Sequence, residues 1–348
     1  MVLPVYNGAR HLPDVIDAIL SQDIDEEQDL EVLVIDDGST DRSASVAGKY
    51  VGTSKVRLLD GGGRGAAAAL NLGIHAARYP IICQLDQDMI PQPFWLKRML
   101  SCLESDPRLA AVQGHFLADP HDGILTRVSA LDLRTRYARL SGSNGDSFRA
   151  DHVCTGNTLY RVEALWGMDL FDESLGYGYD NDMSYRLGEA GFQLAHCPTA
   201  VSIHRRRPGW LAYWREQYGL GYGRLDVIAK QTNRAAGDEV SGLRMVLHAA
   251  GMVAALVLGF GALLLALLGS AWIAPAWAAA GILAVLAGER LCAGLLAAWR
   301  FRDPAGTFFV PVHLLRDLAW AWAIVRWTLR WCAGTPRRPQ FSMGRSHP

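Results

Sequence analysis

One stretch of this sequence is compatible with very few structures. From Met245 to Trp272 the only ionisable side chain is His248, and the other residues are almost all apolar. A helix of this length reaches across the hydrocarbon core of a bilayer, which requires roughly 20 apolar residues. A buried helix of a soluble core is the alternative, but the sequence after it supplies no soluble domain that could bury it. We therefore predict a transmembrane helix at about residues 245–268.

Two further apolar segments follow. The first, at about residues 271–298, predicts a second transmembrane helix, although it contains Glu289 and Arg290. Because an exposed charge inside the bilayer is costly, these two residues either pair with each other or mark the cytoplasmic end of the helix. The other segment, at about residues 308–333, carries charged side chains on one half of a helix and Trp and Leu on the other. That pattern favours a helix lying in the membrane interface, with a third membrane span as the alternative.

The placement of basic residues predicts the orientation of the membrane region. Only the short turn near Ser270 lacks Lys and Arg, whereas Arg244 precedes the first segment and Arg300 and Arg302 follow the second. The tail beyond residue 335 is also rich in Arg. The positive-inside rule then places the N-terminal part and the tail in the cytoplasm. We predict a multi-pass protein of the cell membrane with two spans, because three spans would export the tail.

The residues before the membrane region follow a different pattern. The apolar runs LEVLVID, VRLL and PIICQLD are typical of strands, and segments with helical spacing lie between them. One such helix face comprises Leu12, Val15, Ile16 and Ile19. Alternation of strands and helices predicts an α/β fold, with a mainly parallel mixed sheet flanked by helices. Ligands of such sheets bind beyond the carboxyl ends of the strands.

This pattern gives a domain plan of residues 1–230 for the α/β domain, 231–243 for a polar linker and 244–348 for the membrane region. No secretory signal precedes the first strand, and that strand would need a few more residues before Val2 to reach an ordinary length. The net charge of −1 gives no basic excess of the kind expected for a nucleic-acid-binding protein. The six cysteines are scattered, which favours buried free thiols over a zinc site or disulfides.

Carboxylates gather where the predicted strands end. Asp36 and Asp37 close one apolar run, and Asp86 and Asp88 close another. Two carboxylates entering one loop can converge on Mg²⁺ or Mn²⁺, which prefer oxygen ligands, or can simply solvate a turn. A carboxylate of the first pair could accept hydrogen bonds from a nucleoside. Asp180 stands ahead of a short helical segment, where it could cap the helix or act as a general base.

A glycine-rich segment offers a rival interpretation. Gly63, Gly65 and Ala68 fit the spacing of a dinucleotide-binding fingerprint, and Asp86 follows at a distance close to that of the expected acid. This would make the chain a membrane-anchored NAD-type oxidoreductase. Two strands precede the segment, however, whereas the fingerprint should follow the first strand of its domain. The acid also belongs to a pair, so a flexible loop near a nucleotide is the plainer interpretation.

Four stretches in a fixed order carry a family resemblance: LPVYNGARHLPDVIDAILSQ, LVIDDGSTDRS, LDQDMIPQPFW and YDNDMSYRLGEAGFQLAHCPTAVSIH. Together they resemble the inverting family 2 glycosyltransferases with a GT-A fold, over about Val2 to His204. The resemblance implies that Pro4 and Tyr6 border the nucleotide of a nucleotide-diphosphate sugar. It also implies that Asp37, beside Asp36, binds the nucleoside base.

The same resemblance implies roles at the second and third clusters. Asp86 and Asp88 match the Asp-x-Asp element, with Asp88 as the metal ligand and Asp86 nearer the ribose. Asp180 matches the acid presumed to be the general base, although Tyr179 replaces the Glu that usually precedes it. His204 matches a histidine that approaches the diphosphate or the metal ion. The implied cofactor is Mg²⁺ or Mn²⁺.

One departure from the family bears on the product. Processive members carry a Gln-x-x-Arg-Trp element, whereas Gln217 is followed here by Tyr218, Gly219, Leu220 and Gly221. We therefore expect transfer of a single sugar to an acceptor hydroxyl, with a lipid-linked or cell-envelope glycan as the acceptor. Arg205, Arg206 and Arg207 could meet lipid phosphates or be ordinary surface charges. A transferase-like scaffold without turnover is the third alternative.

Overall fold

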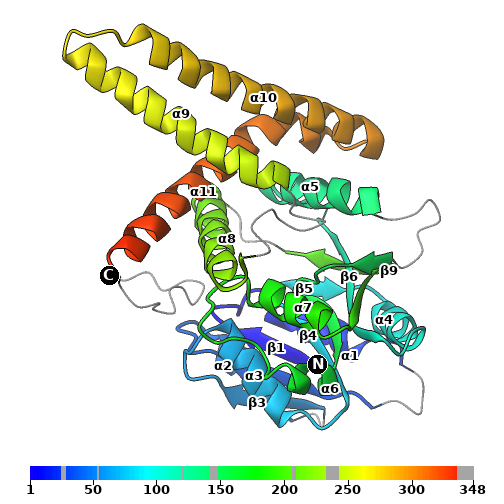
Figure 1. The fold of residues 1–348 in the computed structure, drawn as a ribbon. Helices are drawn as coiled ribbons and strands as arrows, with labels where there is room; N and C mark the ends of the chain where they lie inside the picture. Colours follow the sequence, from blue (N-terminus) through cyan, green and yellow to red (C-terminus); the bar gives the residue numbers. More distant parts are fainter. Residues whose placement is uncertain are drawn as a thin grey trace. The chain divides into compact units, whose positions relative to one another are not determined.

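The computed structural model describes residues 1–24, 29–52, 55–119, 121–140, 148–205, 209–232 and 243–334. These residues form two compact units (Figure 1). The first unit draws on Met1–Pro120 and Ala138–Arg206, and the second on His121–Tyr137 and Arg207–Thr335. The predicted linker and the Arg-rich tail fall mostly outside the described residues, as do Arg206 and Arg207.

A single mixed sheet organises the first unit. Its strands are β1 (Val2–Val5), β2 (Val32–Asp36), β3 (Val56–Asp60), β4 (Ile81–Leu85), β5 (Met89–Pro91), β6 (Leu109–Leu117), β7 (Phe148–Ala150), β8 (Asn157–Arg161) and β9 (Gln193–His204). The order is β3-β2-β1-β4-β8-β6-β9-β5, with β7 pairing β9. The strands β1 to β4 are parallel to one another, and β8 runs antiparallel to both β4 and β6. The predicted α/β class is confirmed, because apolar strands and amphipathic helices alternate through this half of the chain.

Helices cover both faces of this sheet. They are α1 (Leu12–Leu20), α2 (Ser43–Gly48), α3 (Ala66–Ala76), α4 (Trp95–Glu104), α6 (Val162–Gly167) and α7 (Tyr179–Glu189). Alternate residues of the central strands face opposite cores: Leu3 packs with the core that contains α1 and α4, and Val2 with the core that contains α3, α6 and α7. The four predicted apolar residues of α1 are all buried, so the predicted helix face is confirmed. Burial on both faces explains why the strands read as continuous apolar runs.

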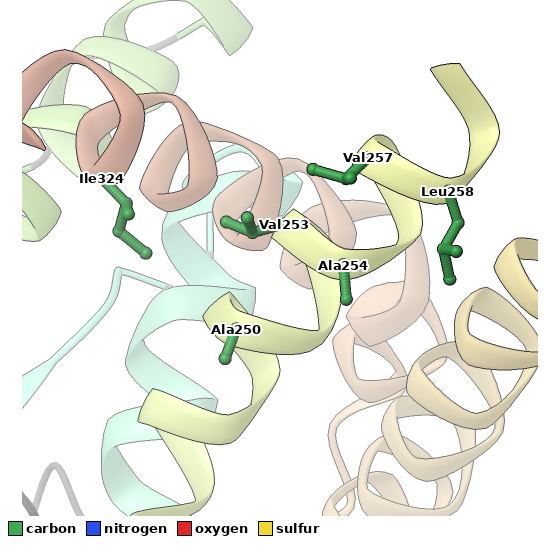
Figure 2. Close-up of a pocket in the computed structure, with 6 residues that line it drawn as sticks. All are labelled: Ala250, Val253, Ala254, Val257, Leu258 and Ile324. Carbon is green, nitrogen blue, oxygen red and sulfur yellow. The ribbon is translucent and has the colours of Figure 1, made fainter. Parts of the chain in front are cut away.

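The second unit is helical. It contains α5 (Ile124–Leu140), α8 (Trp210–Lys230), α9 (Leu243–Leu267), α10 (Ile273–Phe301), the 3₁₀ helix η2 (Pro304–Phe308) and α11 (Phe309–Cys332). The three predicted apolar helices are present, and each is long and apolar enough to cross a membrane. Figure 1 shows α9 and α10 as a hairpin joined by a short turn. An apolar groove of about 570 Å³ borders α9 and α11 (Figure 2). Its lining offers no group for chemistry: Ala250, Val253, Ala254, Val257, Leu258 and Ile324.

Charged side chains join the helices of this unit. Arg290 Nε lies 3.4 Å from Glu289 Oε2, as the paired alternative for these residues predicted. His248 from α9 adds contacts of 3.2 Å to Glu289 and 3.5 Å to Asp317 of α11. Arg316 of α11 also reaches Asp132 of α5 at 3.1 Å. Arg316 and Asp317, which are among the charges predicted on one half of α11, therefore face neighbouring helices, and this pairing lowers the cost of holding them near lipid.

The prediction that the cysteines are buried holds for only some of them. All six are free thiols, and Cys83, Cys102 and Cys197 are buried as predicted. Cys292 and Cys332 are instead exposed. They lie on α10 and α11, whose outer surfaces are apolar, and a thiol is compatible with such a surface because it behaves as a small hydrophobe.

Candidate functional site

The ends of β1, β2 and β4 bring the first predicted residues to one edge of the sheet. Asp36 is the last residue of β2, Tyr6 directly follows β1, and Asp86 directly follows β4. Parallel strands present their carboxyl ends on the same side, so these residues share that edge. Pro4 lies inside β1, aligned with Ile35 of β2. The predicted end of β4 at about Leu85 is confirmed.

Asp37 is buried and fixes the glycine-rich loop. Its Oδ1 accepts a hydrogen bond from the Arg64 N–H at 2.8 Å, and its Oδ2 accepts one from the Gly65 N–H at 2.9 Å. Asp36 instead accepts a bond from the Ser39 N–H at 3.1 Å. The loop follows β3, which is the edge strand of the sheet. A dinucleotide fingerprint belongs after a central strand, so the geometry disfavours the oxidoreductase interpretation.

The second acidic pair lies beside a histidine. Asp88 precedes β5, which pairs with β9 so that Met89 stands opposite His204. This pairing places His204 Nε2 3.5 Å from Asp88 Oδ1. The Arg205 N–H also donates to the Asp88 carbonyl at 2.8 Å, which extends the link between the two chain segments. Residues far apart in the sequence therefore meet here through one strand pairing.

Electrostatics ties this pair to the third cluster. Burial raises the pKa of Asp86 to about 7, and repulsion from Asp88 and Asp180 adds to the increase, while His204 opposes it. Charged groups that shift a pKa in this way lie near the group they affect. Asp88, Asp180 and His204 therefore lie near Asp86.

The residues offer a partial fit to a divalent cation. Within the described part of the chain, no three His, Cys, Asp or Glu side chains form a group ready to hold a metal ion. Two mutually repelling carboxylates with an imidazole alongside nevertheless supply oxygen and nitrogen donors of the kind that Mg²⁺ or Mn²⁺ accepts. Mg²⁺ commonly binds one or two carboxylates and completes its shell with substrate phosphates and water. The donor set thus fits an ion that arrives with a phosphorylated substrate.

Asp180 lies in the first turn of α7. The N-cap is Gly178, with φ +75°, so the alternative of Asp180 as the capping residue is wrong. Gly191, with φ +87°, follows the end of this helix. Burial raises the pKa of Asp180, although hydrogen bonding to the Asn181 N–H and the nearby His152 lower it. A carboxylate with a raised pKa is a stronger base than an exposed aspartate, which suits proton transfer.

The neighbours of Asp180 have structural roles. The Tyr179 hydroxyl lies 3.4 Å from Thr155 Oγ1, and its ring meets Phe171 edge-on, so the tyrosine that replaces the family's Glu fills a partly buried position. Asp182 is fully buried and binds Arg186 at 2.8 Å. Arg186 also donates to backbone carbonyls of the preceding segment. Asp182 therefore stabilises the fold, whereas the Asp180 carboxylate accepts a hydrogen bond from the Asn181 N–H at 2.9 Å.

Sequence reasoning missed two glutamines at this edge. Gln84 Nε2 donates to Asp86 Oδ1 at 3.1 Å, and Gln87 binds the backbone of Tyr6. Gln84 is a polar residue in an otherwise apolar strand, and it is 1% exposed. That interruption of the apolar run was the one signal that could have marked it. Gln87 lies between two acids in a loop, where its residue type carries no pattern.

Comparisons with known proteins agree with this geometry. The family model described as glycosyl transferase family 2 matches residues 1–168. The chain is 24% identical to chondroitin synthase of Escherichia coli, over 60% of this chain and 35% of that protein. It is 26% identical to glycosyltransferase AglE of Haloferax volcanii, over 65% of this chain and 73% of that protein. It thus spans about a third of the first relative and nearly three quarters of the second.

A solved structure shares the fold. The mannosyltransferase PcManGT from Pyrobaculum calidifontis, in complex with GDP-Man and Mn²⁺, superposes with a TM-score of 0.57. The sequences are 21% identical, and the match covers 94% of this chain and 85% of that one. A likeness at this identity extends to the fold alone, so it supports the GT-A architecture.

Proposed function

Residues 1–168 of this chain belong to glycosyl transferase family 2, and from this premise we propose that the protein is a metal-dependent, inverting glycosyltransferase of the hexosyltransferase type. It moves a single sugar from a nucleotide-diphosphate sugar to an acceptor hydroxyl. The observation that carries the proposal is that His204 lies 3.5 Å from Asp88 just beyond the end of β4, with Asp180 near enough to affect the pKa of Asp86. The GDP-Man and Mn²⁺ held by the structural neighbour support a sugar nucleotide as donor.

In this proposal most of the site residues bind the donor and the cation, and one transfers the proton. Asp88 and His204, with Asp86 alongside, would hold the cation and the diphosphate, while Asp36, Asp37, Pro4 and Tyr6 border the nucleoside. A divalent ion bound there supplies Lewis-acid stabilisation of the departing diphosphate.

Asp180 performs the proton transfer. Its carboxylate takes the proton of the acceptor hydroxyl as that oxygen forms a bond to the anomeric carbon. The bond from the anomeric carbon to the diphosphate oxygen breaks on the opposite face, and its electron pair leaves with the nucleotide. Displacement in one step inverts the anomeric configuration. General-base assistance of this kind contributes roughly 10²–10⁴ to a rate.

The membrane region supports an acceptor at the cytoplasmic face. We place two spans at α9 and α10 and keep α11 in the interface, because α11 packs along α8, which carries five charged residues. Asp226 of α8 accepts hydrogen bonds from Trp327 at 2.9 Å and Arg330 at 2.6 Å. A spanning α11 would carry α8, with Arg224 and Lys230, into the bilayer. A lipid-linked or cell-envelope glycan suits an enzyme anchored in this way.

One assay tests the proposal. The protein in detergent is incubated with Mn²⁺, a mixture of membrane-extracted acceptors and a panel of sugar nucleotides, and released nucleoside diphosphate is measured. We expect release from one donor class, loss of release with chelator, and a product whose anomeric configuration is opposite to that of the donor. If no donor yields free nucleoside diphosphate, a scaffold without turnover is favoured. Retention of configuration would exclude the single displacement.

A further inference from the structure

The loop between β4 and β5 is tied to its surroundings by side-chain amides. Gln87 lies between Asp86 and Asp88, and its amide binds the backbone of Tyr6 at both ends. The Tyr6 N–H donates to Oε1 at 2.9 Å, and Nε2 donates to the Tyr6 carbonyl at 3.0 Å. A neighbouring β-strand would make the same pair of hydrogen bonds to a backbone N–H and C=O. The strands β1 and β4 pair only at Val2 and Gln84, so the side chain of Gln87 bridges them beyond the point where their ladder ends.

The chain leaves room for this bridge. A Cβ atom added to Gly8 would lie 2.2 Å from Gln87 Oε1, which is far closer than two such atoms can approach. Glycine at this position therefore lets the amide lie against the backbone after β1. The contact joins the strand end that borders the proposed nucleoside site to the loop that carries the two acids.

A second glutamine holds the other side of the loop. Gln84 Nε2 donates to Asp86 Oδ1 at 3.1 Å, and its Oε1 accepts from the Gly156 N–H at 2.5 Å. Gly156 directly precedes β8, the strand on the other side of β4. The two amides thus fix the loop to β1 on one side and to the start of β8 on the other.

The two side chains that hold this loop are neutral amides, and their neutrality matters for cation binding. Two carboxylates in one loop repel each other, and an unsupported loop would relax by moving them apart. An Arg or Lys in contact would hold them but would also cancel their charge. A neutral amide fixes the geometry and leaves the negative charge available. We propose that Gln84 and Gln87 are positioning residues that hold Asp86 and Asp88 ready for the divalent cation and its nucleotide, an inference that rests on the proposed function.

The test measures cation dependence rather than activity. Calorimetric binding of UDP, GDP, CDP and dTDP is recorded over a range of Mn²⁺ concentrations for Gln84→Leu, Gln87→Leu and Gln87→Glu. We expect the Mn²⁺ concentration for half-maximal binding to rise by about 10–100-fold, the usual cost of losing a group that orients a metal ligand. Gln87→Glu keeps the length and the acceptor for the Tyr6 N–H but loses the donor. Its added negative charge by itself would lower the Mn²⁺ requirement, so a rise in this folded variant can come only from lost positioning.

Gln22→Leu is the matched control. Gln22 is also buried, and its amide makes the same kind of cross-brace: Nε2 donates to the Ala18 and Gln92 carbonyls at 3.1 Å each, and Oε1 accepts from the Leu96 N–H at 3.0 Å. Its bonds join α1 to the start of α4, and none of them is made to Asp86 or Asp88. This variant should lower the thermal unfolding midpoint while its Mn²⁺ dependence stays that of the unmodified protein.

The binding results distinguish failure of the proposed function from failure of the positioning roles. If the unmodified protein binds none of the four nucleotides, the proposed function fails, and the roles of the glutamines fail with it. If it binds one of them and the Gln84 and Gln87 variants show the Mn²⁺ dependence of Gln22→Leu, the proposed function stands and the positioning roles are refuted.

Discussion

Alanine in place of Gly156 is the sharpest perturbation that this structure offers. Gly156 has φ +97°, a region that costs a residue with a Cβ about 1–2 kcal/mol. Its added Cβ would also lie 2.3 Å from Asp86 Oδ2, where ordinary van der Waals contact begins near 3.4 Å. The carboxylate must therefore retreat by about 1 Å, and a misplacement of that size costs about 100-fold in rate.

Gly191 provides the control for backbone strain. It has φ +87°, and a Cβ added there meets no atom within 4 Å. Gly191→Ala should therefore lose about 1–2 kcal/mol of unfolding free energy with unchanged turnover. Gly156→Ala should show at least the same loss together with the drop in rate.

The two variants are compared by denaturant unfolding and by Mn²⁺-dependent nucleotide release from the donor that the panel identifies. A turnover in Gly156→Ala equal to that of the unmodified protein would refute the placement of Asp86 in the site. An equal loss of turnover in Gly191→Ala would show that backbone strain alone explains the effect.

Four other experiments test the remaining assignments. Asp180→Asn should reduce kcat by roughly 10²–10⁴ and leave nucleotide affinity intact, and equal loss of both would indicate a structural residue. Burial raises the pKa of Asp180, and only the ionised carboxylate accepts a proton. As pH is lowered, kcat/KM should therefore fall around a pKa above that of an exposed aspartate. A fall around the ordinary aspartate pKa contradicts this. Asp88→Ala should abolish the Mn²⁺ dependence of nucleotide binding, and unchanged binding would remove Asp88 from the site. Protease added to inside-out vesicles should cleave the tail beyond residue 335, whereas a protected tail would make α11 a third span.

Local patterns predicted the elements that depend on local physics. The spacing of Leu12, Val15, Ile16 and Ile19 defined the buried face of α1 because a helix with one apolar stripe has one way to bury it. The acids after β2 and β4 were predicted at one edge because parallel strands share their carboxyl ends. The three apolar helices were recognisable by length and composition alone.

Contacts between distant segments could not be predicted in this way. The bond between Gln87 and Tyr6 depends on how far β1 and β4 stay paired, which no local pattern encodes. Helix α5 lies within the sequence of the first unit but packs in the second, where Asp132 meets Arg316. Complementary charges more than a hundred residues apart give no periodic signal. Such pairings are decided by the packed structure, since each is weak in isolation.

The direction of one strand accounts for the site as a whole. A sheet with every strand parallel would place the start of β8 at the edge opposite to the end of β4. Because β8 runs antiparallel, Asn157 stands beside Leu85, and the preceding residues Thr155 and Gly156 reach the edge that carries Asp86. From there Gly156 packs on Asp86, while Thr155 reaches Tyr179, the residue before Asp180. Asp180 and the second acidic pair are therefore connected through a strand whose direction its own sequence pattern does not reveal.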